Sequence, residues 1–168
     1  MSSTFILGIS AFYHDSAAAI IKDGEIIAAA QEERFSREKH DSSFPKSAIQ
    51  FCTKQADIKI EECEAIVYYE KPLLVFKRIV NNFISTAPRG SRSFIQAMKI
   101  WLGGKIYLKD IIKYELASLY SINASLLPEI LFAKHHQSHA ASAFYPSPFE
   151  EAIILCMDGV GEWSTTST

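Results

Sequence analysis

The chain has 168 residues, of which 48% are hydrophobic and 21% are charged, so it is long and apolar enough to enclose one sizeable core. Its formal net charge of -2 provides no electrostatic reason to expect a nucleic acid or an anionic membrane as partner. The amino terminus lacks the basic segment of a signal peptide, and no apolar run approaches the roughly 20 residues of a membrane span. Three cysteines without a CxxC pair fit free thiols in a reducing cytosol, so we expect a cytoplasmic location.

The first part of the chain predicts three strands in an antiparallel meander. Short apolar runs occupy residues 5–9, 17–21 and 25–30. Asp23-Gly24, between the second and third runs, suits the primed turns that join hairpin strands. This opening is therefore expected to be β-rich.

A helix and a further strand are predicted next. Residues 31–41 form a charged loop, and a helix is expected to extend to about Ala56, with Ser43 as its N-cap and Pro45 in its first turn. Residues 65–69 then predict a short buried strand.

Residues 72–127 predict an inserted helical subdomain. The helical spacing is interrupted at residues 87–91 and 102–104. Its aromatic side chains either line a surface for a substrate or partner or, as such side chains more often do, pack in the core. They are Phe76, Phe83, Phe94, Trp101 and Tyr107.

Strands are predicted on both sides of a histidine-rich helix. Residues 130–133 precede the helix, Pro146 and Pro148 end it, and residues 152–157 follow it. Two histidines of this helix, His135 and His139, are one turn apart and share a face.

The two histidines and Asp158, at the end of the last predicted strand, suggest a metal site. Imidazole and carboxylate together suit divalent iron, zinc or manganese, and softness alone does not choose among them. A helix start with surface histidines is the alternative interpretation of the HxxxH spacing alone. Asp158 begins the segment Asp158-Gly159-Val160-Gly161, whose glycines would let a tight hairpin bring backbone N–H groups close to a phosphate.

Four segments, in this order, resemble the amino-terminal domain of the O-carbamoyltransferases of the nodulation, cephamycin and tobramycin type. They are residues 14–18, 32–40, 135–144 and 158–163, and the resemblance spans nearly the whole chain. It implies an α/β fold of the ribonuclease-H-like, actin-like (ASKHA) class, with a mixed sheet, flanking helices and a helical insertion at about 72–127. It also implies that residues 1–168 form the amino-terminal lobe only, so we expect the second lobe and the adenylate-forming domain to be absent.

The resemblance implies a metal- and ATP-dependent carbamoyltransferase. Carbamoyl phosphate and ATP would yield carbamoyl-adenylate, from which the carbamoyl group passes to a hydroxyl of a sugar or natural product. His135, His139 and Asp158 would be the metal ligands, with iron expected first and zinc or manganese as alternatives. The metal would hold and polarise the phosphate of the adenylate. The enzyme that transfers threonylcarbamoyl to tRNA is similar in this domain and also has an HxxxH metal pair.

Further site residues follow from the charges that this transfer develops. A carbamoyl oxyanion and a leaving phosphate need cations or N–H donors, so His14, Lys39 and Arg34 are candidate catalytic residues. His14 could instead act as general base. The candidate nucleotide-phosphate contacts are Gly159 and Gly161, with Ser10 as a second possibility beside Gly8. The structural alternatives are an ion-paired turn at residues 32–34 and a strand cap at residues 14–15.

One lobe by itself is expected to be inactive and to expose an apolar face, which predicts an oligomer. A function of a different class is also open, namely a non-catalytic module of the same fold that binds a nucleotide or a partner. A plain ribonuclease-H-like core domain is a third.

Overall fold

The computed structural model describes residues 3–159 and 161–168 of the chain. These residues form two compact units, and we describe each by itself. Unit 1 comprises the residues up to Tyr69 together with Lys109–Phe132, and unit 2 comprises Glu70–Leu108 and Ala133–Thr168. Across the described ranges, no helix combines the length and the apolar character needed to span a membrane.

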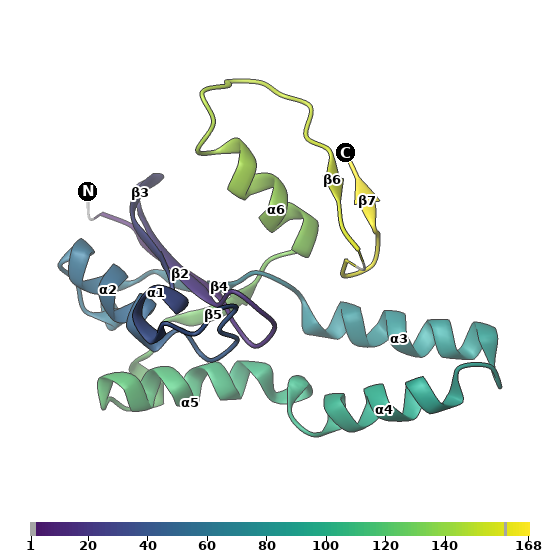
Figure 1. The fold of residues 1–168 in the computed structure, drawn as a ribbon. Coiled ribbons are helices and arrows are strands. Elements are labelled where there is room, and N and C mark those ends of the chain that lie inside the picture. The colour runs from purple at the N-terminus through teal and green to yellow at the C-terminus, as the bar shows by residue number, and fades with distance from the viewer. Residues whose placement is uncertain (1–2, 160) are drawn as a thin grey trace. The chain divides into compact units, whose positions relative to one another are not determined.

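Unit 1 is built on a five-stranded mixed sheet with the order β3-β2-β1-β4-β5 (Figure 1). The strands are β1 (Phe5–Ser10), β2 (Ala17–Lys22), β3 (Glu25–Gln31), β4 (Ala65–Tyr68) and β5 (Glu129–Phe132). The pairs β1–β2 and β2–β3 are antiparallel, which confirms the predicted meander, whereas β1–β4 and β4–β5 are parallel. The predicted mixed α/β fold with flanking helices is confirmed at this level.

Two helices, α2 (Lys46–Ala56) and α5 (Leu108–Tyr120), complete the core of unit 1. Ile112 and Leu116, which are one turn apart on α5, are fully buried, and the adjacent residues Ala48 and Ile49 of α2 are also fully buried. The short 3-10 helices η1 (Ile60–Glu62) and η3 (Ala124–Leu126) lie in the connections. The buried residues that alternate along the strands and those on the inner faces of α2 and α5 therefore form one apolar core.

The cysteines of unit 1 are buried free thiols, as expected. Burial raises the pKa of Cys52 and of Cys63 to about 11. The Cys52 thiol donates to the carbonyl oxygen of Ala18 at 3.4 Å, so it packs against the sheet.

Two predictions for the segment before α2 were wrong. The charged loop contains a helical turn, α1 (Glu33–Ser36), directly after β3. Ser43 does not cap α2, because the helix starts at Lys46 and its first N–H groups point to a carboxylate from further back in the chain. That carboxylate is Glu32, which accepts from Ser47 N at 3.1 Å and from Ala48 N at 2.8 Å.

In unit 2, α3 (Pro72–Thr86) and α4 (Ser91–Leu102) form an antiparallel helical pair, followed by η2 (Lys105–Tyr107) (Figure 1). The two interruptions that the sequence predicted separate these elements. Phe83 and Phe94 stack with ring centroids 4.1 Å apart, and Phe76 meets the buried ring of Trp101 at 5.5 Å. These four aromatic rings therefore pack between helices, whereas Tyr107 is exposed.

The rest of unit 2 consists of α6 (His135–Phe144) and a hairpin of β6 (Cys156–Met157) and β7 (Thr166–Ser167). The prediction of a strand over residues 152–157 was wrong for its first four residues. Only Cys156 and Met157 find backbone partners in β7, so the preceding residues have no ladder to join. Ile153 is 94% exposed as a result.

Candidate metal centre

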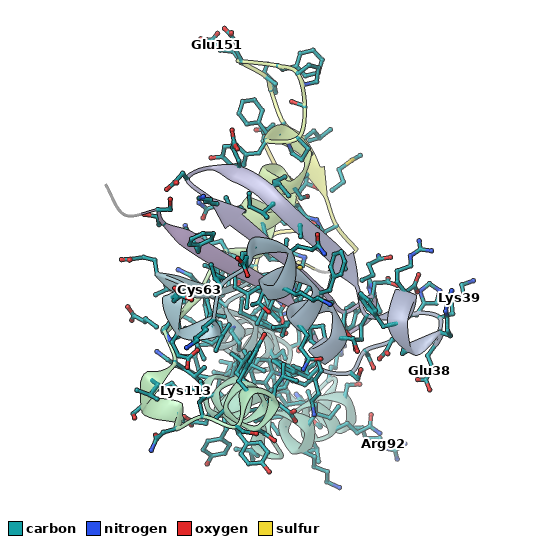
Figure 2. All side chains as sticks on the ribbon, turned by 90° about the vertical axis from the view of Figure 1, so that its left-hand side faces the viewer. Glu38, Lys39, Cys63, Arg92, Lys113 and Glu151 are labelled. Atoms are coloured by element: carbon teal, nitrogen blue, oxygen red, sulfur yellow. The ribbon has the colours of Figure 1, made fainter. Side chains whose placement is uncertain are left out.

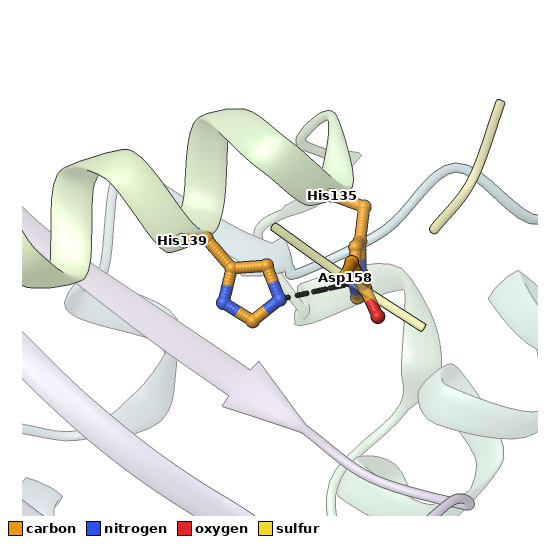
Figure 3. Close-up of side chains that lie close together, drawn as sticks. All are labelled: His135, His139 and Asp158. Atoms are coloured by element: carbon orange, nitrogen blue, oxygen red, sulfur yellow. Dashed lines mark hydrogen bonds and ion pairs between the residues drawn. The ribbon is translucent and has the colours of Figure 1, made fainter. Parts of the chain in front are cut away.

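The first part of the candidate site is the amino-terminal turn of α6. His135 and His139 are one turn apart on this helix, and their Nε2 atoms lie 3.1 Å from each other. Figure 3 shows the two rings meeting beside Asp158. The side chain of His135 is 16% exposed and that of His139 is 56% exposed, so one imidazole is enclosed and the other borders solvent.

Asp158 completes the cluster from the end of β6. Its Oδ2 lies 2.6 Å from Nε2 of His135 and 3.8 Å from Nε2 of His139. The Asp158 N–H donates to the carbonyl oxygen of Thr165 at 2.7 Å, which holds the carboxylate at the mouth of the hairpin. One ligand atom from each of the three residues lies within 4.8 Å of the other two.

The donor set fits a divalent transition metal. Two imidazole nitrogens and a carboxylate oxygen suit iron, zinc and manganese. If Nε2 of His135 carries a proton, its single N–H must be shared between two acceptors, the Asp158 carboxylate and Nε2 of His139. A bound cation would instead accept one lone pair from each of the three groups. The enclosed position of His135 also departs from a helix start with surface histidines.

Two further carboxylates approach His135, and the sequence analysis missed the role of both. The buried Glu162 accepts from the His135 N–H at 3.4 Å and from the Lys71 N–H, so it connects the start of α6 to the start of α3. Glu70 Oε2 lies 3.9 Å from Nδ1 of His135. The one feature of the sequence that could have indicated a role for Glu70 is its position directly after the predicted strand at 65–69.

The glycines of the hairpin differ in their surroundings. Gly161 has φ +59° and a Cβ there would lie 2.1 Å from the carbonyl oxygen of Ser164, so a side chain is excluded. Gly159 has open space at the same point. Val160, between them, lies outside the described residues. The guanidinium of Arg78 donates to the Gly161 carbonyl oxygen, which ties the hairpin to α3.

A second polar cluster lies in unit 1, around the loop after β1. His14 Nδ1 lies 2.7 Å from Oδ2 of Asp15, and His40 Nδ1 lies 2.9 Å from Oδ1 of the same carboxylate. Hydrogen bonds from His40 and then from His14 lower the pKa of Asp15 from its usual 3.8. The His14 ring is therefore held by the carboxylate of its own neighbour.

The other predicted site residues of unit 1 stand apart from this cluster. Ser10 is the last residue of β1 and is half-buried. Arg34 lies on α1 and Lys39 in the loop after it, and both side chains are exposed; Figure 2 shows Lys39 extending outward. Among the described residues, neither Arg34 nor Lys39 takes part in an ion pair, so the ion-paired turn at residues 32–34 is not formed.

Comparison with known proteins connects the whole of this architecture to one family. Residues 5–168 match the family model described as the carbamoyltransferase N-terminus. A protein of Synechocystis sp., sll1178, is 60% identical over 164 residues, which is 98% of this chain and 27% of the relative. The nodulation protein NolNO of Sinorhizobium fredii is 32% identical over 154 residues, which is 92% of this chain and 21% of the relative. The chain thus spans about a quarter of the length of these relatives.

Proposed function

Because the chain belongs to the family of carbamoyltransferase amino-terminal domains, we propose that it is part of a metal- and ATP-dependent O-carbamoyltransferase. In this proposal the carbamoyl group comes from a carbamoyl-adenylate, made from carbamoyl phosphate and ATP, and goes to a hydroxyl of a sugar or natural product. The observation that carries the proposal is the convergence of His135, His139 and Asp158 in unit 2.

The strand order of unit 1 supports the fold part of the proposal. An antiparallel meander followed by two parallel strands on the β1 side is consistent with a ribonuclease-H-like lobe of the actin-like ATPase class. In such a mixed sheet the segments that follow the parallel strands leave from one edge, where α/β proteins bind ligands. We propose that residues 1–168 act as the amino-terminal lobe of the enzyme.

The residues around the candidate centre have distinct tasks in this scheme. His135, His139 and Asp158 would hold the metal, which supplies Lewis-acid polarisation of a phosphate oxygen when bound. Glu162 fixes the start of α6 through the His135 N–H, and so positions both imidazoles. Gly159 and Gly161 offer a hairpin on which backbone N–H groups can approach the nucleotide phosphate without a Cβ in between.

Unit 1 supplies the proposed acid–base and charge-stabilising groups. Asp15 fixes Nδ1 of His14, which leaves Nε2 as the atom that takes a proton from an acceptor hydroxyl. Lys39 and Arg34 are proposed to neutralise charge on the carbamoyl oxygen or on the leaving phosphate. Ser10, at the end of β1, is a second proposed contact to the nucleotide.

The test is the metal content and ATP affinity of the purified chain and of its His139→Ala variant. We expect near-stoichiometric metal after loading with ferrous iron, zinc or manganese under anaerobic conditions, and calorimetric ATP binding that is tighter with metal present. His139→Ala removes one of three ligands, so metal affinity should fall by at least on the order of a hundredfold. Gln137→Ala, on the exposed side of the same helix, should retain both properties.

Each outcome bears on the proposal. Equal metal content in the chain and in His139→Ala would exclude the three-residue centre. Metal binding without any effect on ATP affinity would contradict a metal that holds the nucleotide phosphate, and would favour a metal-binding module without this chemistry.

A further inference from the structure

A polar stripe on α3 lines a cleft in unit 2 that the proposed metal centre does not use. Arg78, Asn81, Asn82 and Ser85 follow the spacing i, i+3, i+4 and i+7, so they share one face of the helix. The cleft that they line has a volume of about 670 Å³. Small-molecule sites in proteins commonly enclose roughly 300–1,000 Å³, so the cleft has room for a ligand of one or two rings.

The opposite wall comes from the β6–β7 hairpin. Gly159, Trp163 and Thr165 line this side of the cleft, and Trp163 is 53% exposed. Gly159 directly follows Asp158, so the cleft begins one residue from the candidate metal centre. The hydrogen bond from Arg78 to the Gly161 carbonyl oxygen joins the two walls.

The hydrogen-bonding groups of the stripe are suited to a ligand that both donates and accepts. The Asn81 and Asn82 amides each offer a carbonyl acceptor and an NH₂ donor. The Ser85 hydroxyl already donates to the backbone carbonyl oxygen of Asn82 at 3.0 Å, so towards a ligand its oxygen is an acceptor. A ligand hydroxyl can donate to this oxygen, whereas an ionised phosphate has no proton to donate.

Charge and shape lead to the same ligand class. Arg78 is the one charged residue that lines the described part of the cleft, which is little positive charge for a polyphosphate. A half-exposed indole ring offers an apolar face of the kind on which the C–H face of a sugar ring can stack. We propose that this cleft binds a neutral, hydroxyl-rich ring compound, namely the sugar acceptor of the transfer reaction.

This inference rests on the proposed function and adds to it the location of the acceptor. A sugar in this cleft would lie beside Gly159, the residue that follows Asp158. The polar stripe on α3 would determine which acceptor binds, whereas the proposed metal ligands would act in the same way with every acceptor.

The experiment is ligand-observed NMR saturation transfer with methyl glucoside and cellobiose, with inorganic pyrophosphate as competitor. We expect both sugars to receive saturation at millimolar concentration and pyrophosphate not to displace them. Trp163→Ala should weaken binding by about tenfold, because the stacking face is lost, and Trp163→Phe should restore much of it. Asn82→Ala should weaken it by about fivefold, equivalent to one hydrogen bond, whereas Gln96→Ala on α4 should have no effect.

The outcomes separate this inference from the proposed function. Sugar binding by a parent chain that takes up no metal would support the cleft and sink only the metal centre. Metal binding without saturation of either sugar would overturn the cleft and leave the proposed function standing. Binding that ignores Trp163→Ala and Asn82→Ala, in variants with unchanged circular dichroism, would also overturn it, and so would displacement by pyrophosphate.

Discussion

Asp15 is a single carboxylate that holds two imidazoles from separate loops. Its backbone has φ +52° and that of His40 has φ +58°, so both residues occupy the left-handed region that Asp and His tolerate better than most side chains. The pKa of Asp15 is lowered in the folded chain, so its carboxylate contributes stability above pH 3.8. This contribution is lost as the pH falls through the lowered folded-state pKa.

We therefore expect Asp15→Asn to melt at a lower temperature than the parent chain at neutral pH. The gap should shrink as the pH falls below 3.8, because the parent carboxylate is then being protonated as well. Thermal melts by circular dichroism between pH 3 and pH 7 would measure this. Asn accepts the same backbone conformation, and Asp23→Asn serves as a control carboxylate at φ +50°. A gap that does not change with pH would contradict the assignment.

Local spacing was enough to predict part of the candidate site. The one-turn separation of His135 and His139 places both rings on one face, and Asp158 was found because it ends an apolar run. Glu162, Glu70 and the Asp15–His40 contact were missed, since each depends on partners distant in the chain. No periodicity in the sequence encodes which buried carboxylate reaches which N–H group.

At the level of elements, α2 depends on a carboxylate that precedes it by more than a helix turn. Glu32 is buried, and its two oxygens accept from the N–H groups of Ser47 and Ala48 at the positive end of the helix. We expect Glu32→Ala to lower the free energy of unfolding by about 2 kcal/mol, since one buried and one half-buried N–H group lose a charged acceptor.

Urea denaturation followed by circular dichroism would measure this loss. Glu32→Gln, which retains one amide oxygen, should fall between Glu32→Ala and the parent. Glu38→Ala removes an exposed carboxylate of the same loop (Figure 2) and should be neutral within about 0.5 kcal/mol. A similar loss for Glu32→Ala and Glu38→Ala would show that Glu32 does not cap α2.

Some helices and strands could be predicted from local sequence patterns and others could not. The meander, α2 and the breaks between α3, α4 and α5 follow from alternation, helical spacing and the glycine and proline positions. Ser43 looked like a cap because its residue type favours that position, but a tertiary carboxylate satisfies the helix end instead. Residues 152–155 looked like a strand because they are apolar, and a strand also requires a partner ladder.

For the molecule as a whole, the exposed apolar side chains before and in β6 predict self-association. Ile153, Leu155 and Met157 are 94%, 56% and 77% exposed, and they occupy every second position of this segment. We expect the average mass of the chain in multi-angle light scattering to rise with concentration. Burial of these side chains between copies would remove them from water.

Ile153→Ser with Leu155→Ser should shift this rise to concentrations about tenfold higher or more, because apolar area at the contact is lost. Ile84→Ser is the matched control, since Ile84 is 70% exposed but lies on α3. A monodisperse monomer at all concentrations would sink the prediction, and an equal effect of Ile84→Ser would locate the contact elsewhere.

The parallel neighbours β4 and β5 are joined by residues 69–128, with α3 and α4 inside that connection. The closure entropy of such a connection grows only with the logarithm of its length, so lengthening, shortening or resurfacing its α3–α4 part, as distinct from the core helix α5, costs the sheet little. Since the proposed sugar-contacting stripe lies on this connection and the proposed metal ligands do not, the preference for an acceptor could diverge between relatives by local insertion and substitution. The proposed metal centre would then stay the same in relatives that differ in their acceptor substrates.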